Sequence, residues 1–275
     1  MSPKSAMYRL VSRLILVAGA FVSLFPFYWT AVAATNPSGK VFAKPPQLVP
    51  GSMFLENLFN LNASIGIFRV LFNSTFVTCV YTLFSLTVCT MAGYAFAKFR
   101  FPGRNALFSV FLVSLMVPYH ATLIPLFKMM ASWEWINTYL ALIFPNVAYP
   151  FAIFLMRQNL LAMPDAVMEA ARIDGVGEWR LFVSIVLPSM RPALAAAAIY
   201  LFVYQWNNFL WPLVATSTKE MYTLPVALSS LIGLSRIDYG QVMTGVTIAT
   251  GPIVAFFLIL QRQFISGILG GAIKE

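Results

Sequence analysis

Long apolar runs recur along the chain, and they constrain its fold more than any other feature. The first run, Leu14 to Ala34, is long enough to cross a bilayer as a helix, which takes roughly 20 residues. Backbone polar groups inside a membrane must be satisfied within the protein, so such runs fold as helices or closed barrels. Of the 275 residues, 60% are hydrophobic and only 10% are charged. The sequence therefore predicts an all-α, polytopic membrane protein.

The apolar runs predict one transmembrane domain, residues 1–275, with six transmembrane helices. The predicted spans are about 14–34, 71–97, 107–130, 138–156, 192–215 and 243–260, with a polar loop at 164–188 and a tail at 261–275. The small residues Ala31-Val32-Ala33 at the end of the first run also resemble a secretory cleavage site. The length of that run favours a helix that is kept.

Two long polar connections separate these spans. Residues 53–70 mix large apolar side chains with asparagines, which fits an interfacial amphipathic helix. The alternative is a solvated or partner-contacting loop. Residues 216–242 are predicted to form a loop with turns at Pro225 and Gly240.

The third predicted span contains two prolines and two ionisable side chains. Pro118 and Pro125 free backbone carbonyls at membrane depth, which protein or a water-filled path has to satisfy. His120 and Lys128 are candidates for the translocation pathway, because ionisable groups inside spans usually mark one. His120 can equally be a neutral hydrogen-bonding strut.

The second half of the fifth span presents one polar and aromatic face. Hydroxyls, amides and flat rings suit a sugar, which offers hydroxyls and a C–H surface. The alternative is an aromatic belt at the membrane interface, above all for Trp211. Trp206 lies off this face and is expected to pack. The candidate pathway residues on this face are Tyr200, Tyr204, Asn207, Asn208 and Trp211.

A charged island interrupts the apolar pattern between the fourth and fifth spans. Pro164 and Asp165 favour a helix start, and Gly175 favours a helix end. A second short helix is expected from about Glu178 to Val186, closed by Pro188. Small alanines allow close approach to a partner, and the charged residues offer it polar contacts.

The spacing of the island resembles the signature loop of permease subunits in binding-protein-dependent ABC importers. The candidate residues for coupling to an ATPase are Glu169, Ala170, Ala171, Asp174, Gly175, Ile185, Leu187 and Pro188. The passage from Tyr94 to Gly103 and the tail, with Gln261, Gly267 and Gly271, resemble MalG-like carbohydrate permeases, although Glu275 stands where glycine is usual.

The resemblance implies a fold and a set of partners. It implies the type I ABC importer fold, in which the island is a cytoplasmic coupling helix. It also implies a second, MalF-like permease, two ATP-binding subunits that hold Mg-ATP, and an extracytoplasmic solute-binding protein.

The distribution of Lys and Arg gives the orientation. With both termini in the cytoplasm, twelve of the 18 basic residues lie inside and six outside. The positive-inside rule therefore independently places the island in the cytoplasm. The resemblance implies that the membrane is the bacterial cytoplasmic (inner) membrane.

Several functions are disfavoured by what the sequence lacks. It has no phosphate-binding Gly-x-x-x-x-Gly-Lys-Ser/Thr loop, so the energy for transport has to come from partner subunits. One histidine and two cysteines, Cys79 and Cys89, provide neither a zinc site nor a catalytic constellation, and the cysteines are read as small packing residues. The net charge of +9 comes from scattered residues rather than a nucleic-acid-binding cluster.

The sequence thus indicates a transport subunit that is not itself an enzyme, with a di- or oligosaccharide as substrate. An acidic uronate or alginate-type fragment is admissible, because His120 and Lys128 are potentially cationic and no carboxylate lies in the predicted spans. A secondary carrier or channel for a polar solute is the alternative, although it usually relies on intramembrane carboxylates.

Overall fold

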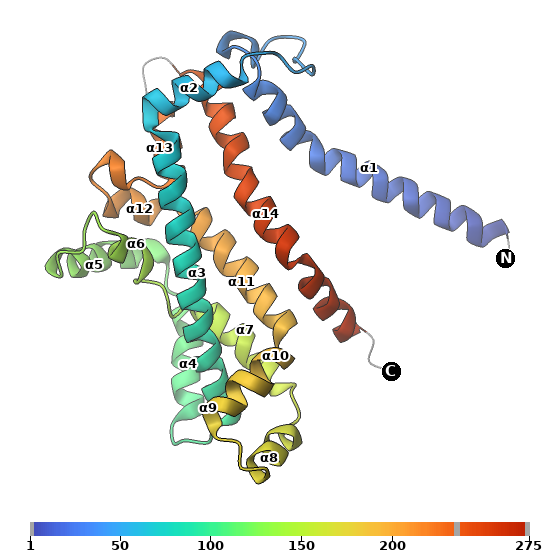
Figure 1. Ribbon diagram of the computed structural model, residues 1–275, viewed down its shortest axis with the longest axis vertical. Coiled ribbons are helices and arrows are strands. Elements are labelled where there is room, and N and C mark those ends of the chain that lie inside the picture. Colours follow the sequence, from blue (N-terminus) through green and yellow to red (C-terminus); the bar gives the residue numbers. More distant parts are fainter. Residues whose placement is uncertain (1–2, 234–236, 273–275) are drawn as a thin grey trace. The chain divides into compact units, whose positions relative to one another are not determined.

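The computed structural model describes the backbone of residues 3–233 and 237–272, and the side chains of residues 7, 8, 10–233 and 237–263. All regular secondary structure in the described residues is helical, in agreement with the predicted all-α class (Figure 1). The α-helices are α1 Pro3–Ala34, α2 Phe54–Ile65, α3 Ile67–Lys98, α4 Arg104–Ser114, α5 Tyr119–Ser132, α6 Tyr139–Ile143, α7 Pro150–Leu161, α8 Asp165–Ile173, α9 Glu178–Leu181, α10 Leu187–Ser189, α11 Arg191–Trp206, α12 Leu210–Ala215, α13 Leu224–Ile232 and α14 Tyr239–Ala272.

The chain divides into two compact units. The first comprises Met1–Phe68 and Ala227–Gly251, and the second comprises Arg69–Val226 and Pro252–Glu275. Within the first unit, the predicted amphipathic segment is helical as α2. The buried Asn57 of α2 donates from Nδ2 to the carbonyls of Ala34 and Asn36, at 2.9 and 3.0 Å, and so satisfies the C-terminus of α1.

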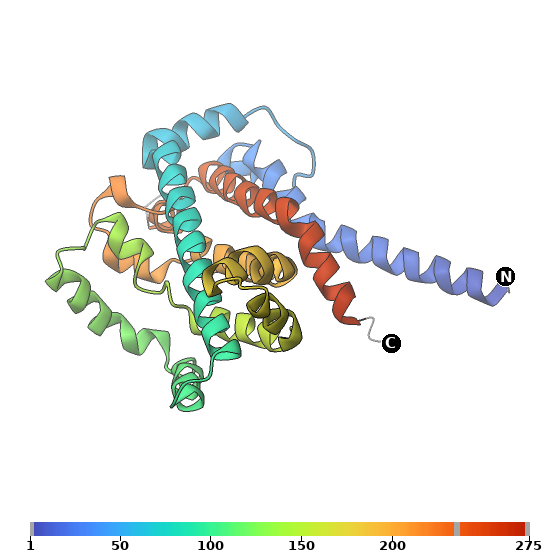
Figure 2. The ribbon, with the colours of Figure 1, turned by 60° about the horizontal axis from the view of Figure 1, so that its bottom comes forward.

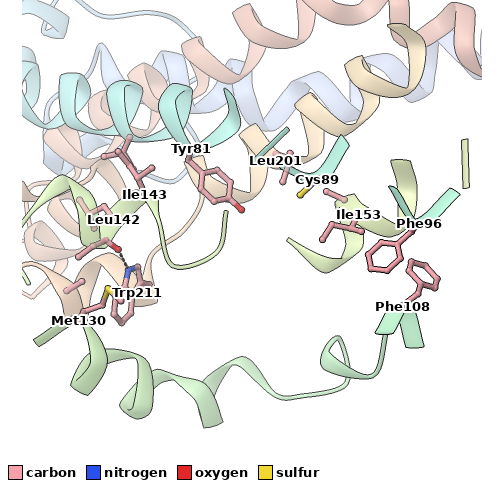
Figure 3. Packing of buried hydrophobic residues seen from close by; sticks show 14 residues of the cluster. Tyr81, Cys89, Phe96, Phe108, Met130, Leu142, Ile143, Ile153, Leu201 and Trp211 are labelled. Carbon is pink, nitrogen blue, oxygen red and sulfur yellow. Dashed lines mark hydrogen bonds between the residues drawn. The ribbon is translucent and has the colours of Figure 1, made fainter. Parts of the chain in front are cut away.

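The second unit is built around α3, the long central helix of Figure 1. Its buried face contributes Val77, Tyr81 and Cys89 to a core shared with residues of α4 to α7, α11 and α12 (Figure 3). Gly93 allows α3 and α7 to touch: a Cβ at this position would lie 2.8 Å from Met156 Cβ and 2.9 Å from Arg157 N. Small residues at such contacts are typical of membrane helix packing.

Three helical segments among the described residues are long and apolar enough to cross a membrane: Leu10–Ala34, Ile67–Lys98 and Tyr239–Gln263. Two further helix pairs pass the same test together but are sharply bent. The pair α4 and α5 is bent by 101°, which Figure 2 makes visible, and the pair Glu178–Ser189 and α11 by 81°. Broken helices thus take the place of straight spans in the middle of the chain.

The two turns predicted at Pro225 and Gly240 are wrong. Pro225 lies in the first turn of α13, where a proline costs no backbone hydrogen bond, and Gly240 is the second residue of α14. The helix that begins at Glu178 continues through a π-helical turn, Phe182–Val186, into α10 and ends at Ser189. Pro188 thus lies one residue before the end of this helix, in agreement with the prediction that it closes the helix.

Candidate functional site

Three breaks between helices of the second unit meet at one cleft. They lie between α4 and α5, between α6 and α7, and between α11 and α12. The cleft has a volume of ≈ 1040 Å³, and its walls come from residues within the segments 114–122, 145–150 and 203–210. Non-helical backbone at membrane depth is tolerated where protein buries it or where it lines a water-filled cavity. The cleft is therefore the structural reason why these helices can be broken.

Prolines set two of these breaks. Pro118 precedes the first turn of α5 with extended backbone, and Pro150 is the first residue of α7. A proline disfavours helical backbone at the residue before it, so a helix ends there and a new one begins. The third break follows Trp206, where the side chain of Asn207 donates to the Val203 carbonyl at 2.8 Å.

The break between α6 and α7 is held by side chains of α3. The hydroxyl of Tyr81 donates to the carbonyl of Asn146 at 3.1 Å. The thiol of Cys89 reaches the carbonyls of Val147 and Tyr149, at 3.5 and 3.6 Å. Cys89 therefore does more than pack, because its one S–H can donate to either of two carbonyls in the broken segment.

The end of α6 is held in the same way from the opposite side. Trp211 donates from Nε1 to the Ala141 carbonyl at 2.7 Å, the dashed line in Figure 3, and Gln205 donates from Nε2 to the Leu142 carbonyl at 3.1 Å. Donors from three helices thus fix the backbone of the broken segment, which gives the cleft a rigid wall.

The structure brings four of the predicted pathway residues together in the cleft wall: His120, Tyr204, Asn207 and Asn208. Tyr200 lies beside this wall, and its hydroxyl is 3.2 Å from that of Tyr149. Lys128 lies elsewhere, exposed on α5 and outside the cleft lining.

The two tryptophans of this region pack rather than line the cleft. Trp211 is 1% exposed and belongs to the hydrophobic core, where its ring N–H donates to the Ala141 carbonyl of α6. Trp206 is 3% exposed, which confirms the expectation that it packs.

The lining residues missed from the sequence include Tyr119, Asn146 and Tyr149. Each is the immediate neighbour of a proline, in Pro118-Tyr119, Pro145-Asn146 and Tyr149-Pro150. Polar residues flanking prolines in apolar runs were the available signal. The rings of Tyr149 and Tyr204 lie 4.6 Å apart, so the cleft wall has an aromatic surface beside its amides.

The charged island forms a helical hairpin, α8 followed by α9. The predicted break at Gly175 is confirmed, since its φ is +78°, which is left-handed backbone. Met168 and Ala171 are buried on the inner side of α8. The remaining candidate coupling residues of the hairpin, Glu169, Ala170, Asp174 and Gly175, are exposed, while Ile185 and Leu187 are half-buried and Pro188 is exposed.

Two ion pairs attach and stiffen this hairpin. Lys98 Nζ at the end of α3 lies 2.6 Å from Asp165 Oδ1. Arg172 Nε lies 2.6 Å from Glu178 Oε1, and the Tyr94 hydroxyl donates to Glu178 Oε2 at 3.4 Å. Hydrogen bonds from Lys98 and Arg172 lower the pKa of the Asp165 and Glu178 carboxyls, respectively, and the Glu178 carboxylate raises the pKa of Arg172.

The candidate tail residues Gln261, Gly267 and Gly271 all lie within α14. Gln261 is half-buried and donates to the Leu258 carbonyl at 3.1 Å. Gly267 and Gly271 lie on the α14 backbone beyond the last described side chain, and Lys274 and Glu275 lie outside the described residues.

Comparisons with known proteins agree on the class of the chain. The lactose transport system permease protein LacG of Rhizobium radiobacter is 36% identical over 256 residues, which cover 93% of each chain. The arabinooligosaccharides transport system permease protein AraQ of Bacillus subtilis is 34% identical over 276 residues, which cover 99% of this chain and 98% of AraQ. The crystal structure of a bacterial ABC transporter involved in the import of the acidic polysaccharide alginate contains a chain with the same fold, at a TM-score of 0.79 and 19% identity over 96% of this chain and 99% of that one.

The family model described as the binding-protein-dependent transport system inner membrane component matches residues 89–269. This range includes the three helix breaks and the island. The chain therefore belongs to this family and is a membrane-embedded permease subunit of a binding-protein-dependent ABC transport system.

Proposed function

We propose that this permease imports a di- or oligosaccharide and forms half of the translocation pathway, together with a second, MalF-like permease. The observation that carries the proposal is the cleft at the three helix breaks, where amides and tyrosine rings line one wall. Such a wall offers hydrogen bonds to hydroxyls and flat surfaces to sugar rings. Two relatives are named for the transport of lactose and of arabinooligosaccharides, which supports the same substrate class.

The island is proposed to couple this pathway to two ATP-binding subunits, which hold Mg-ATP. Its exposed face carries Glu169, Ala170 and Asp174, while the ion pair between Lys98 and Asp165 ties it to α3. A movement of the island would thereby reach the helix whose side chains hold the cleft wall. Such rigid-body rocking around a central site is the general basis of alternating access.

The orientation follows from the basic residues. An island in the cytoplasm implies that both termini are also cytoplasmic and that the cleft opens within a bacterial inner membrane. The extracytoplasmic solute-binding protein is then proposed to deliver sugar from the opposite side. The tail residues Gln261, Gly267 and Gly271 are proposed to approach the ATP-binding subunits.

An acidic oligosaccharide, such as a uronate or alginate-type fragment, is a second candidate substrate. The observation that favours it is His120, the one lining residue able to carry a positive charge, in a wall without Asp or Glu among the described residues. Lys128 lies outside the lining, so any contact with an anion would fall to His120.

The proposal can be tested on the reconstituted complex of both permeases, the ATPase subunits and the binding protein. ATPase activity is measured with lactose, arabinotriose and trimannuronate. Stimulation by at least one of these sugars is expected, and the identity of that sugar separates neutral from acidic substrates. ATP hydrolysis that none of the three sugars stimulates would contradict a sugar importer of this class.

A further inference from the structure

Polar groups without partners gather in the wall of the cleft. The hydroxyl oxygen of Tyr119 is buried and has no hydrogen-bond partner among the described residues. Leaving such a group unsatisfied is costly, so native structures keep few of them, and those few call for an explanation. Tyr119 begins α5 immediately after the proline break, where the chain could readily have held an apolar ring instead.

Two lining amides are also unpaired. The side-chain amides of Asn146 and Asn208 make no hydrogen bond to another described residue, although the backbone of each is held. The carbonyl of Asn146 accepts from Tyr81, and the N–H of Asn208 donates to the Gln205 carbonyl at 3.2 Å. Both residues are half-buried. Each amide therefore presents a donor and an acceptor from a fixed backbone.

Some polar groups of the cleft wall already have partners. The side-chain nitrogen of Asn207 donates to the Val203 carbonyl, and the hydroxyl of Tyr149 lies 3.2 Å from that of Tyr200, which lies beside the wall. Among the described lining residues there is no Asp, Glu, Lys or Arg. Recognition in the cleft thus falls to neutral hydrogen-bonding groups, with His120 the exception.

We propose that Tyr119, Asn146 and Asn208 recognise the hydroxyl groups of a glycosyl unit in this chain's own half of the pathway. The proposal rests on the proposed sugar-import function and names the residues that set its specificity. The three residues come from three different helix breaks, one from each. The aromatic pair Tyr149 and Tyr204 supplies the apolar surface that a sugar ring also needs.

The test uses the complete importer in proteoliposomes, with saturating sugar-loaded binding protein and ATP inside. The variants are Tyr119→Phe, Asn146→Ala and Asn208→Ala. The sugar is whichever of lactose, arabinotriose or trimannuronate the wild type imports. Tyr222→Phe and Asn159→Ala serve as matched controls, because both residues lie outside the cleft, and Asn159 bonds only within its own helix.

Each cleft variant is expected to lower the sugar delivered per ATP hydrolysed by about three- to tenfold, the loss of one neutral hydrogen bond. ATPase stimulation by the loaded binding protein should persist, since docking does not use these groups. A role in folding alone would lower delivery and ATPase activity together, and that result would overturn the proposal. Delivery at the wild-type ratio in all three variants would overturn it as well.

Deoxy analogues of the imported sugar identify the hydroxyl involved. The wild type should deliver an analogue lacking the recognised hydroxyl less well than the unmodified sugar. The matching variant should deliver that analogue and the unmodified sugar equally well. Equal losses in wild type and variants, for every analogue, would mean that the hydroxyl is recognised elsewhere. Import by the wild type alone already decides the sugar-import function, so its failure is separable from that of these three residues.

Discussion

Lys98 and Asp165 join helix α3 of the permease to the charged island. Lys98 Nζ lies 2.6 Å from Asp165 Oδ1 and also 2.6 Å from the carbonyl of Met163, so it caps the segment that leads into α8. The Lys98 side chain is 3% exposed, whereas that of Asp165 is 72% exposed. A buried ammonium thus depends on a carboxylate at the surface.

This asymmetry predicts an order of effects. Asp165→Ala should impair transport more than Lys98→Met, because it leaves a buried charge with only one carbonyl, whereas Lys98→Met leaves a carboxylate in water. The predicted defect is uncoupling, in which ATP hydrolysis persists while sugar delivery per ATP falls. Measuring both rates in proteoliposomes tests this order; a larger defect in Lys98→Met would contradict it.

The two ion pairs of the island also predict its pH response. The pKa values of Asp165 and Glu178 are lowered in the folded protein, so their contribution is complete above the ordinary pKa and is lost as the pH falls through the lowered one. Protection of residues 165–178 from limited proteolysis should therefore be constant from neutral pH to about pH 5 and fall below about pH 4. Loss of protection between pH 7 and 6 would show that another group controls the island.

Gly175 and Gly177 offer a matched pair. Gly175 has a φ of +78°, so Gly175→Ala should cost about 1–2 kcal/mol locally and disturb the turn between α8 and α9. Gly177 has a φ of −65° and open space around its Cα, so Gly177→Ala should be nearly neutral. ATPase stimulation by loaded binding protein is the measurement, and equal activities of the two variants would refute the role of this turn.

Tyr81 holds the broken segment through a single hydrogen bond to the Asn146 carbonyl. Tyr81→Phe should cost about 1 kcal/mol and lower the Tm by roughly 2–4 °C, because the half-buried Asn146 carbonyl loses its donor. Sugar delivery should also fall, since Asn146 is no longer held. Tyr222→Phe is the control for thermal unfolding in detergent, and an unchanged Tm in Tyr81→Phe would show that the wall does not need this bond.

Gly93, the single glycine of α3, is predicted not to tolerate replacement by alanine. Gly93→Ala would put a Cβ within 3 Å of both Met156 and the backbone of Arg157, at a cost of about 1–3 kcal/mol. The exposed Gly19 of α1 has nothing within 4 Å of such a Cβ, so Gly19→Ala should be neutral. Assembly of the complex, followed by size-exclusion chromatography, distinguishes the two; normal assembly of Gly93→Ala would contradict the close contact.

Sequence reasoning predicted the helical class, the break at Gly175 and the cleft positions of His120, Tyr204, Asn207 and Asn208. These features depend on local chemistry: apolar length, glycine backbone freedom and helical spacing. Such information is carried by neighbouring residues and needs no knowledge of tertiary contacts.

The remaining features depend on tertiary contacts that no local pattern contains. In one continuous helix Trp211 would share a face with Tyr204. The helix breaks after Trp206, and Trp211 is buried in the core instead. Lys128 follows His120 by two turns, yet α5 leaves it exposed and outside the cleft. The role of Cys89 requires two carbonyls from a segment roughly sixty residues away in sequence, which its own surroundings do not reveal.

The central claim is that sugar passes through the cleft at the three helix breaks. Thiol labelling tests it most directly, on the complete importer carrying Asn208→Cys in a background with Cys79→Ser and Cys89→Ser, the latter keeping a hydrogen-bond donor. A small membrane-impermeant maleimide should label this position, and the imported sugar should slow labelling during turnover. Labelling that is absent, or that proceeds at the same rate with and without sugar during turnover, would contradict the claim.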